Sequence, residues 1–130
     1  MQQRTVIGLD IGGTSTRGLR AEGPAGAPGS ELVIVAEAAG GSSNVQNVSR
    51  DQARQRLAAV LEELGAAELD PAAHRVDVVI GAGGVDTDDD ARRLRQLVIE
   101  AAGTLAAAQL RIVHDTRLLL AAAEIGRAHV

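Results

Sequence analysis

The stretch that most constrains the fold of this chain is residues 6–19, with the sequence VIGLDIGGTSTRGL. An apolar run ends in Asp10, glycines follow at positions 12 and 13, and hydroxyl residues lead into a second run with alternating apolar positions. A Gly-Gly pair between two strand-like runs predicts a β-hairpin, because a tight primed turn needs positive φ at both central positions. We therefore expect the chain to begin with two antiparallel strands, over residues 4–10 and 15–22.

The same turn has the composition of a phosphate cradle. Glycines lack a Cβ, so the backbone N–H groups around them can approach an anion closely. The hydroxyl side chains would add neutral donors, and Asp10 could hold a hydrated divalent cation through its carboxylate oxygens. The phosphate-binding residues expected on this interpretation are Gly12, Gly13, Thr14, Ser15 and Thr16. Taken alone, the stretch is equally consistent with an ordinary exposed hairpin whose aspartate helps to close the turn.

The rest of the chain alternates between strand-like and helical patterns. Further strands are expected over residues 31–39, 76–80 and 110–113. One helix should begin after Ser49, whose spacing to Gln52 has the form of a capping box, a second at Thr87, and a third over 117–123. The order β-β-β-α-β-α-β-α predicts an α/β domain, a mixed sheet with helices on its faces, because hairpins join antiparallel neighbours and crossovers join parallel ones.

Polar or glycine-rich segments follow the three strands that should run parallel. Parallel strands end at the same edge of a sheet, and ligands of open α/β sheets bind there. At that edge we expect Asp10, the glycine-rich segment 81–84 and Asp115. Asp115 could accept the proton of a substrate hydroxyl that attacks a γ-phosphate, or could serve only as a helix N-cap. The glycines could leave room for a ligand or only for a turn, and they do not complete a dinucleotide motif, because position 86 is Asp.

Two other polar segments have a structural and a functional interpretation. Asn44 lies in a Gly-Ser-Ser-Asn loop after the third strand. Its amide offers both a donor and an acceptor, as sugar hydroxyls require, although ordinary turns also favour asparagine. The consecutive aspartates at 88–90 are expected to match the positive end of a helix dipole rather than to bind a metal ion.

The composition argues against several classes of function. A formal net charge of −4 and the absence of aromatic residues leave no basic surface and no platform for base stacking, so we expect no nucleic-acid partner. Without cysteine, the chain has no disulfide framework, no thiol nucleophile and no ligands for an iron–sulfur cluster. No signal peptide and no apolar run of about 18 residues is visible, so we expect a cytoplasmic location and no membrane partner.

Four motifs, taken in order, resemble a known family. Asp10-Ile11-Gly12-Gly13-Thr14 is similar to the first phosphate motif of the actin-like ATPase and sugar-kinase superfamily. Gly41-Ser42-Ser43-Asn44, Gly81-Ala82-Gly83-Gly84-Val85-Asp86 and His114-Asp115-Thr116 resemble the N-acetylglucosamine kinase branch, the BadF/BadG/BcrA/BcrD-type ATPases. The resemblance covers residues 4–123 and implies a ribonuclease-H-like domain whose strands have the order 3-2-1-4-5.

The resemblance also implies ATP and Mg²⁺ as cofactors and assigns roles to individual residues. Asp10 would position Mg²⁺, and the hydroxyl and backbone groups around Thr14 would touch the ATP phosphates. Asp115 would act as the general base, while the family commonly has Asn or Thr at the position of His114, to which no role is assigned. The residues implied to bind a sugar substrate are Asn44, Gly83, Gly84 and Asp115.

The implied function is ATP-dependent phosphorylation of N-acetylglucosamine or a related amino sugar. The alternative is an ATP-hydrolysing activator of the BadF/BadG type, which has no sugar substrate. Proteins of this superfamily place two such domains around the nucleotide, and this sequence lacks the second phosphate loop and the adenosine-binding segment. Residues 1–123 are therefore expected to be the N-terminal domain of a longer enzyme and to be inactive alone. A homodimer is the oligomeric state considered for the full-length protein. Residues 124–130 match the in-frame translation of a sequencing-adapter oligonucleotide and are expected to be a non-native tail.

Overall fold

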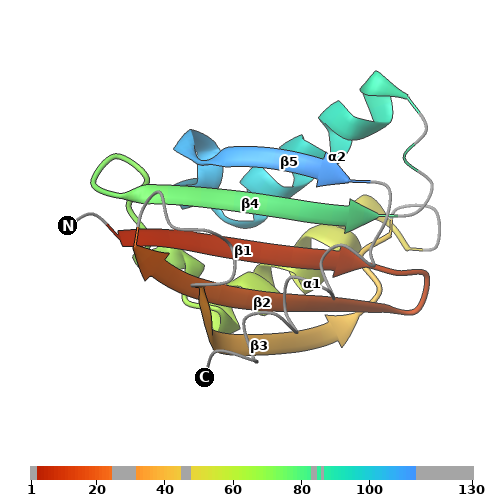
Figure 1. The fold of residues 1–130 in the computed structure, drawn as a ribbon. Helices are drawn as coiled ribbons and strands as arrows, with labels where there is room; N and C mark the ends of the chain where they lie inside the picture. Colours follow the sequence, from red (N-terminus) through yellow and green to blue (C-terminus); the bar gives the residue numbers. More distant parts are fainter. Residues whose placement is uncertain (1–2, 25–31, 45–47, 83–84, 86, 114–130) are drawn as a thin grey trace.

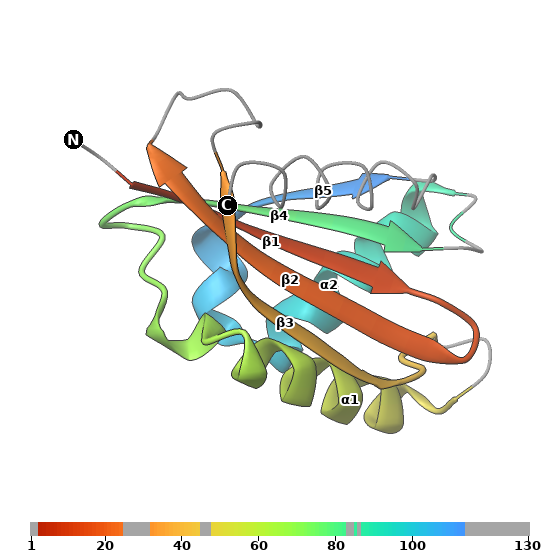
Figure 2. The same cartoon turned by 60° about the horizontal axis from the view of Figure 1, so that its bottom comes forward.

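A computed structural model describes residues 3–24, 32–44, 48–82, 85 and 87–113. These residues form a five-stranded sheet with two α-helices packed on one of its faces (Figures 1 and 2). The strands are β1 (Gln3–Ile11), β2 (Ser15–Pro24), β3 (Val33–Gly41), β4 (Arg75–Ala82) and β5 (Gln109–Val113). The α-helices are α1 (Arg50–Glu63) and α2 (Asp88–Ala101), and two short 3₁₀ helices are η2 (Ala66–Glu68) and η3 (Gly103–Ala107). No helix in the described ranges is long and apolar enough to cross a lipid bilayer.

The strand order in the sheet is β3-β2-β1-β4-β5. Strand β2 pairs antiparallel with β1 and β3, whereas β4 pairs parallel with β1 and β5. This pairing confirms the predicted mixed sheet and its strand order. The third predicted helix, over 117–123, and the predicted tail at 124–130 lie outside the described residues.

The core lies between the sheet and the two helices. Ile7, Leu9 and Ile11 alternate along β1 and are at most 2% exposed, and their register partners on β4 are also buried. The helices contribute the buried side chains Leu57, Val60, Leu61, Leu97 and Val98. Because the sequence has no aromatic residue, aliphatic side chains supply this apolar burial.

Both helices begin at the predicted capping residues. The Ser49 hydroxyl accepts a hydrogen bond from the Gln52 backbone N–H at 3.2 Å, which satisfies one of the unpaired donors at the start of α1. At α2 the capping box is reciprocal: Thr87 Oγ1 accepts from the Asp90 N–H, and the Asp90 carboxylate accepts from the Thr87 N–H. The aspartates at 88–90 therefore lie in the first turn of a helix, as predicted, where their charge opposes the positive end of its dipole.

Strand β2 holds the carboxyl end of α1 through a glycine and an arginine. A Cβ on Gly18 would lie 2.8 Å from Leu64 Cδ1 and 2.9 Å from Val60 Cγ1, so only glycine allows this close packing. The guanidinium of Arg20 donates to the carbonyl of Leu64 at 3.1 Å and to that of Gly65 at 3.3 Å. A cation at the negative end of the helix dipole stabilises the end of α1.

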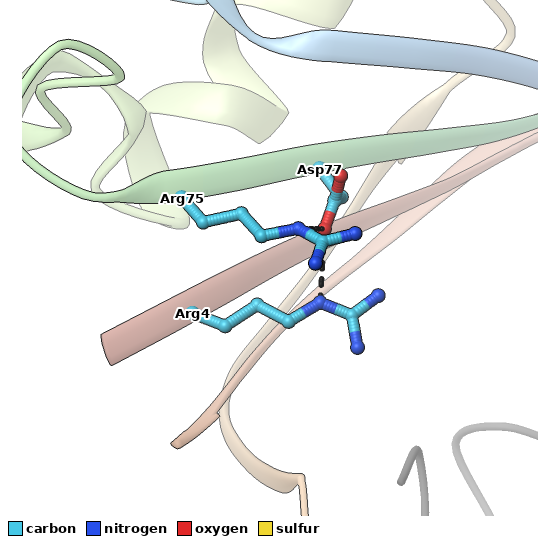
Figure 3. Close-up of polar contacts among 3 residues, drawn as sticks. All are labelled: Arg4, Arg75 and Asp77. Carbon is cyan, nitrogen blue, oxygen red and sulfur yellow. Dashed lines mark hydrogen bonds and ion pairs between the residues drawn. The ribbon is translucent and has the colours of Figure 1, made fainter. Parts of the chain in front are cut away.

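The amino-terminal ends of β1 and β4 are joined by three charged side chains (Figure 3). Arg4 and Arg75 are register partners on these parallel neighbours, so their like charges lie close together. Asp77 Oδ2 accepts from Arg4 Nε at 2.9 Å and from Arg75 Nε at 3.0 Å, and its side chain is only 12% exposed. We refer to Arg4, Arg75 and Asp77 as the charge triad. The triad lies on the sheet face opposite α1 and α2 and ties β1 to β4.

Candidate functional site

The glycine turn, residues 12–14, connects β1 to β2 at the carboxyl end of β1. It is not the predicted primed turn, because within the described ranges Gly65 is the only residue with positive φ. The connection is wider: Ile11 pairs with Thr16, and the Gly12 N–H donates to the Ser15 carbonyl at 2.9 Å. The extra length removes the need for left-handed backbone at the two glycines. Space at Gly12 is still limited, since a Cβ there would lie 3.3 Å from the Ser15 carbonyl oxygen.

The hydroxyl residues of this segment have different surroundings. Thr14 and Ser15 are exposed, so an approaching anion can reach both of them. Thr16 is fully buried, and its hydroxyl lies 2.6 Å from the Ser43 hydroxyl, with which it shares a hydrogen bond. Alternation along β2 turns the Thr16 side chain toward the helices, while phosphate binding at Thr16, which the sequence also assigned to the backbone N–H groups of this segment, stays a prediction. The buried Thr16 side chain, directly after the turn, is thus hydrogen-bonded to the loop after β3.

Asp10 lies at the carboxyl edge of the sheet, where the strand ends meet as predicted. Its register partners are Arg17 on β2 and Gly81 on β4, and Val113 at the end of β5 pairs with Gly81 in turn. Gly81 presents no side chain beside the Asp10 carboxylate. The predicted site residues of the other two strands are Gly83, Gly84 and Asp115. In the sequence they follow β4 and β5, and they lie outside the described residues.

The donor chemistry around Asp10 fits a hydrated magnesium ion. Asp10 is partly exposed, and no ion pair within the described residues involves it. No group of three or more His, Cys, Asp or Glu side chains gathers in that part of the chain. A lone carboxylate is compatible with Mg²⁺, which prefers oxygen ligands, keeps several waters and takes further ligands from substrate phosphates.

Arg17 is a candidate residue that the sequence did not reveal. It is exposed, it lies opposite Asp10, and it forms no ion pair within the described ranges. A two-residue turn at the glycines would have placed Ser15 opposite Asp10, and the wider turn places Arg17 there instead. The geometry thus puts a cation beside the carboxylate, close to the exposed hydroxyls of the turn.

Asn44 belongs to a loop that is bonded directly to the glycine turn. Ser42 Oγ donates to the Gly12 carbonyl at 3.1 Å, and the Asn44 N–H donates to Ser42 Oγ at 3.2 Å. On the other side of the loop, Arg56 Nη1 of α1 donates to the Ser42 carbonyl at 2.8 Å. The structure therefore brings the Asn44 backbone next to the turn, and it adds Ser42 and Arg56, whose roles depend on contacts distant in sequence.

The fold can be compared with known proteins. Neither a family model nor a curated protein matches the sequence. Among solved structures, the human cytomegalovirus terminase nuclease domain matches with a TM-score of 0.52 and 11% identity, over 98% of this chain and 62% of that one. Two structures of the Aquifex aeolicus Ppx/GppA enzyme match with TM-scores of 0.46 and 0.44 and identities of 15% and 17%. Each of these matches covers 85% of this chain, and 36% and 35% of the Aquifex chains.

These matches concern the fold. At such low identities a shared arrangement of strands and helices is all that a similarity shows, and the two Ppx/GppA scores, both below 0.5, add no argument. The sheet order and the nuclease-domain match define a ribonuclease-H-like α/β domain, the fold predicted from the sequence. The chain spans about a third of the length of the Aquifex chains and 62% of the nuclease domain.

Proposed function

We propose that this domain binds the phosphates of ATP together with Mg²⁺ at its glycine turn. We further propose that it forms one side of the active site of a sugar kinase, with N-acetylglucosamine or a related amino sugar as substrate. The observation that carries the proposal is the hydrogen-bonded contact between the glycine turn and the loop of Asn44, through Ser42. This contact puts a segment suited to phosphate beside one suited to sugar hydroxyls, as a phosphoryl transfer between them requires.

The turn would bind phosphate through neutral donors and one nearby cation. Thr14 and Ser15 are exposed, so their hydroxyls and the adjacent backbone can be directed toward a phosphate oxygen. Arg17 would add a charge-assisted bond, which is stronger than a neutral one. When bound, Mg²⁺ would supply charge neutralisation of the phosphate oxygens, with Asp10 holding one of its waters.

Four residues would form the sugar side of the site, and Asn44 is the one whose position the structure describes. Asn44 would hold a sugar hydroxyl with its amide, which provides both a donor and an acceptor. By the family resemblance, Gly83 and Gly84 would line the sugar and Asp115 would accept the proton of the attacking hydroxyl. A carboxylate within hydrogen-bonding distance of that proton would increase the nucleophilicity of the sugar oxygen.

The proposal is tested with the sugar kinase that we propose to contain this domain. We expect Mg·ATP-dependent phosphorylation of N-acetylglucosamine or glucosamine, abolished by Asp115→Ala while nucleotide binding persists. Asn44→Ala should raise the KM for the sugar with little change in the KM for ATP. Slow ATP hydrolysis that no sugar alters would contradict the kinase proposal and favour an ATP-driven activator. Unchanged turnover in Asp115→Ala would remove the assigned base.

A further inference from the structure

Two serines directly after β3 are buried, although the segment 42–44 to which they belong has no apolar side chain. Residues 42–44 have the sequence Ser-Ser-Asn, and Ser42 is 5% exposed and Ser43 is 1% exposed. Burial of hydroxyl groups is unfavourable unless they are hydrogen-bonded. No buried side-chain polar atom in the described residues lacks a partner. The position of this loop is therefore set by hydrogen bonds rather than by apolar packing.

Two of those hydrogen bonds hold both sides of the glycine turn. Ser42 Oγ donates to the carbonyl of Gly12, the first residue of the turn, and Ser43 shares a hydrogen bond with Thr16, which follows the turn. Ser42 Oγ also accepts from the Asn44 N–H. A single hydroxyl thus connects the backbone of the turn to the backbone of Asn44.

Arg56 supports this hydroxyl from the helix side. Its Nη1 donates to the Ser42 carbonyl at 2.8 Å, and its guanidinium lies against Gly41, where a Cβ would be 3.2 Å from Nε and 3.3 Å from Cζ. Within the described ranges Arg56 makes no ion pair with a carboxylate, whereas Arg50 and Arg54 of the same helix each do. The charge-assisted bond to the loop carbonyl is therefore the main polar contact that Arg56 makes there.

We propose that Arg56 is a positioning residue that, through Ser42, makes the loop 41–44 and the turn 12–14 a single unit whose two ligands bind cooperatively. The inference rests on the proposed function, since it takes the phosphate at the turn and the sugar at Asn44 as those ligands. A phosphate that orders the turn fixes the Gly12 carbonyl, and thereby Ser42 and the Asn44 backbone. Phosphate binding then provides part of the conformational entropy loss that sugar binding would otherwise require. By thermodynamic linkage, sugar binding must raise the affinity for phosphate by the same factor.

The first test uses amide hydrogen exchange in the ligand-free protein. Arg56 has no hydrogen bond to Gly12, yet Arg56→Met should accelerate exchange of the Gly12 amide as well as that of Asn44, each about fivefold, the effect of losing one net hydrogen bond. Ser42→Ala should do the same, Arg56→Lys should restore part of the protection, and the control Arg54→Met should change neither amide. Acceleration confined to the loop, with Gly12 unaffected in both variants, would overturn the proposal.

The second test measures the coupling with Mg·ADP and N-acetylglucosamine. In the proposed sugar kinase, saturating Mg·ADP should tighten sugar binding at least fivefold, within the usual range of coupling between sites. Ser42→Ala and Arg56→Met should reduce this ratio toward one while both ligands still bind, and Arg54→Met should keep it. A wild-type ratio of one with both ligands bound overturns the coupling alone. Absence of sugar binding overturns the proposed function and the coupling together.

Discussion

At their amino-terminal ends, β1 and β4 carry charged side chains that are paired with one another, and at the carboxyl end of β1 lies a charged side chain without an ion pair among the described residues. In the charge triad, the Asp77 carboxylate accepts from both Arg4 and Arg75 (Figure 3). At the opposite end of the same strand pair, Asp10 lies beside Gly81 and no ion pair in the described ranges involves it. The charged side chains are thus paired at the amino-terminal ends of the two strands, whereas Asp10 at the carboxyl end of β1 has no ion pair within the described residues.

We expect the paired charges at the amino-terminal ends to affect stability and the charge at the carboxyl end to affect ligand binding. Removal of one partner from a partly buried group of paired charges is destabilising, because it leaves the remaining charges uncompensated. Charges without a protein partner at the carboxyl edge of an open sheet are available to a ligand and its metal ion. Substitutions at the triad should therefore change the free energy of unfolding, and substitutions at the carboxyl edge should change nucleotide affinity.

The largest effect is expected for Asp77→Ala. This change leaves two neighbouring guanidinium groups without their shared carboxylate, so the free energy of unfolding should fall by about 3 kcal/mol. Urea denaturation measures the loss, and the Mg·ADP affinity of the folded variant should equal that of the wild type. A loss below about 0.5 kcal/mol would show that the triad behaves as an ordinary surface ion pair.

Asp10→Asn should have the next largest effect, at the other end of the strands. Removal of the charge that we propose to hold hydrated Mg²⁺ should weaken Mg·ADP binding about tenfold, or about 1.4 kcal/mol. The free energy of unfolding should change by less than about 0.5 kcal/mol, because no ion pair in the described ranges is lost. Calorimetric titration and urea denaturation give the two quantities. Unchanged affinity with a large loss of stability would reverse the assignment of the two ends.

Arg17→Met should weaken Mg·ADP binding by a smaller factor, about fivefold, because an exposed cation contributes about 1 kcal/mol. The difference between the variant and the wild type should shrink at high salt, since screening weakens interactions between exposed charges. Arg95→Met is the matched control, because Arg95 is exposed on α2 and is not paired in register with Asp10. Equal losses in the two variants would point to net charge rather than to a position beside the turn.

The smallest effect is expected for Arg75→Met, which sharpens the description of the triad itself. The Arg75 side chain is 48% exposed, and Asp77 keeps its bond to Arg4 at 2.9 Å. The free energy of unfolding should therefore fall by at most about 0.5 kcal/mol. Arg75→Met also removes the repulsion between the two arginines. If it is as destabilising as Asp77→Ala, that repulsion is not the cause of the loss of stability in Asp77→Ala.

The elements of this domain were predictable because their signals are local. Ser49 and Thr87 mark the starts of the two helices by side chains that bond within three residues along the chain. Apolar alternation identified the strands, and the order of hairpins and crossovers then determined the sheet, with the resemblance giving the strand order. The direction of the parallel strands also predicted that the candidate site lies at the carboxyl edge of the sheet.

The contacts within the site could not be predicted, because each depends on register or on distant residues. The glycine pair predicted a two-residue turn, and the wider turn observed changes the partner of Asp10 to Arg17. The surroundings of the Thr16 hydroxyl could not be predicted either, because the face of the strand on which a side chain lies determines its contacts. Ser42 and Arg56 reach the site through bonds that span 30 and 14 residues of sequence, for which no local pattern exists.

The central claim is that the glycine turn binds nucleotide phosphate, and a titration of the ¹⁵N-labelled protein with Mg·ADP tests it most directly. The amides of residues 12–15 should shift in a saturable manner at millimolar ligand, the shifts should require Mg²⁺, and Asp10→Asn should weaken them. The amides of Arg4, Arg75 and Asp77 at the other end of the strands should stay unchanged. Saturable shifts centred on the charge triad, or no response at residues 12–15, would contradict the claim.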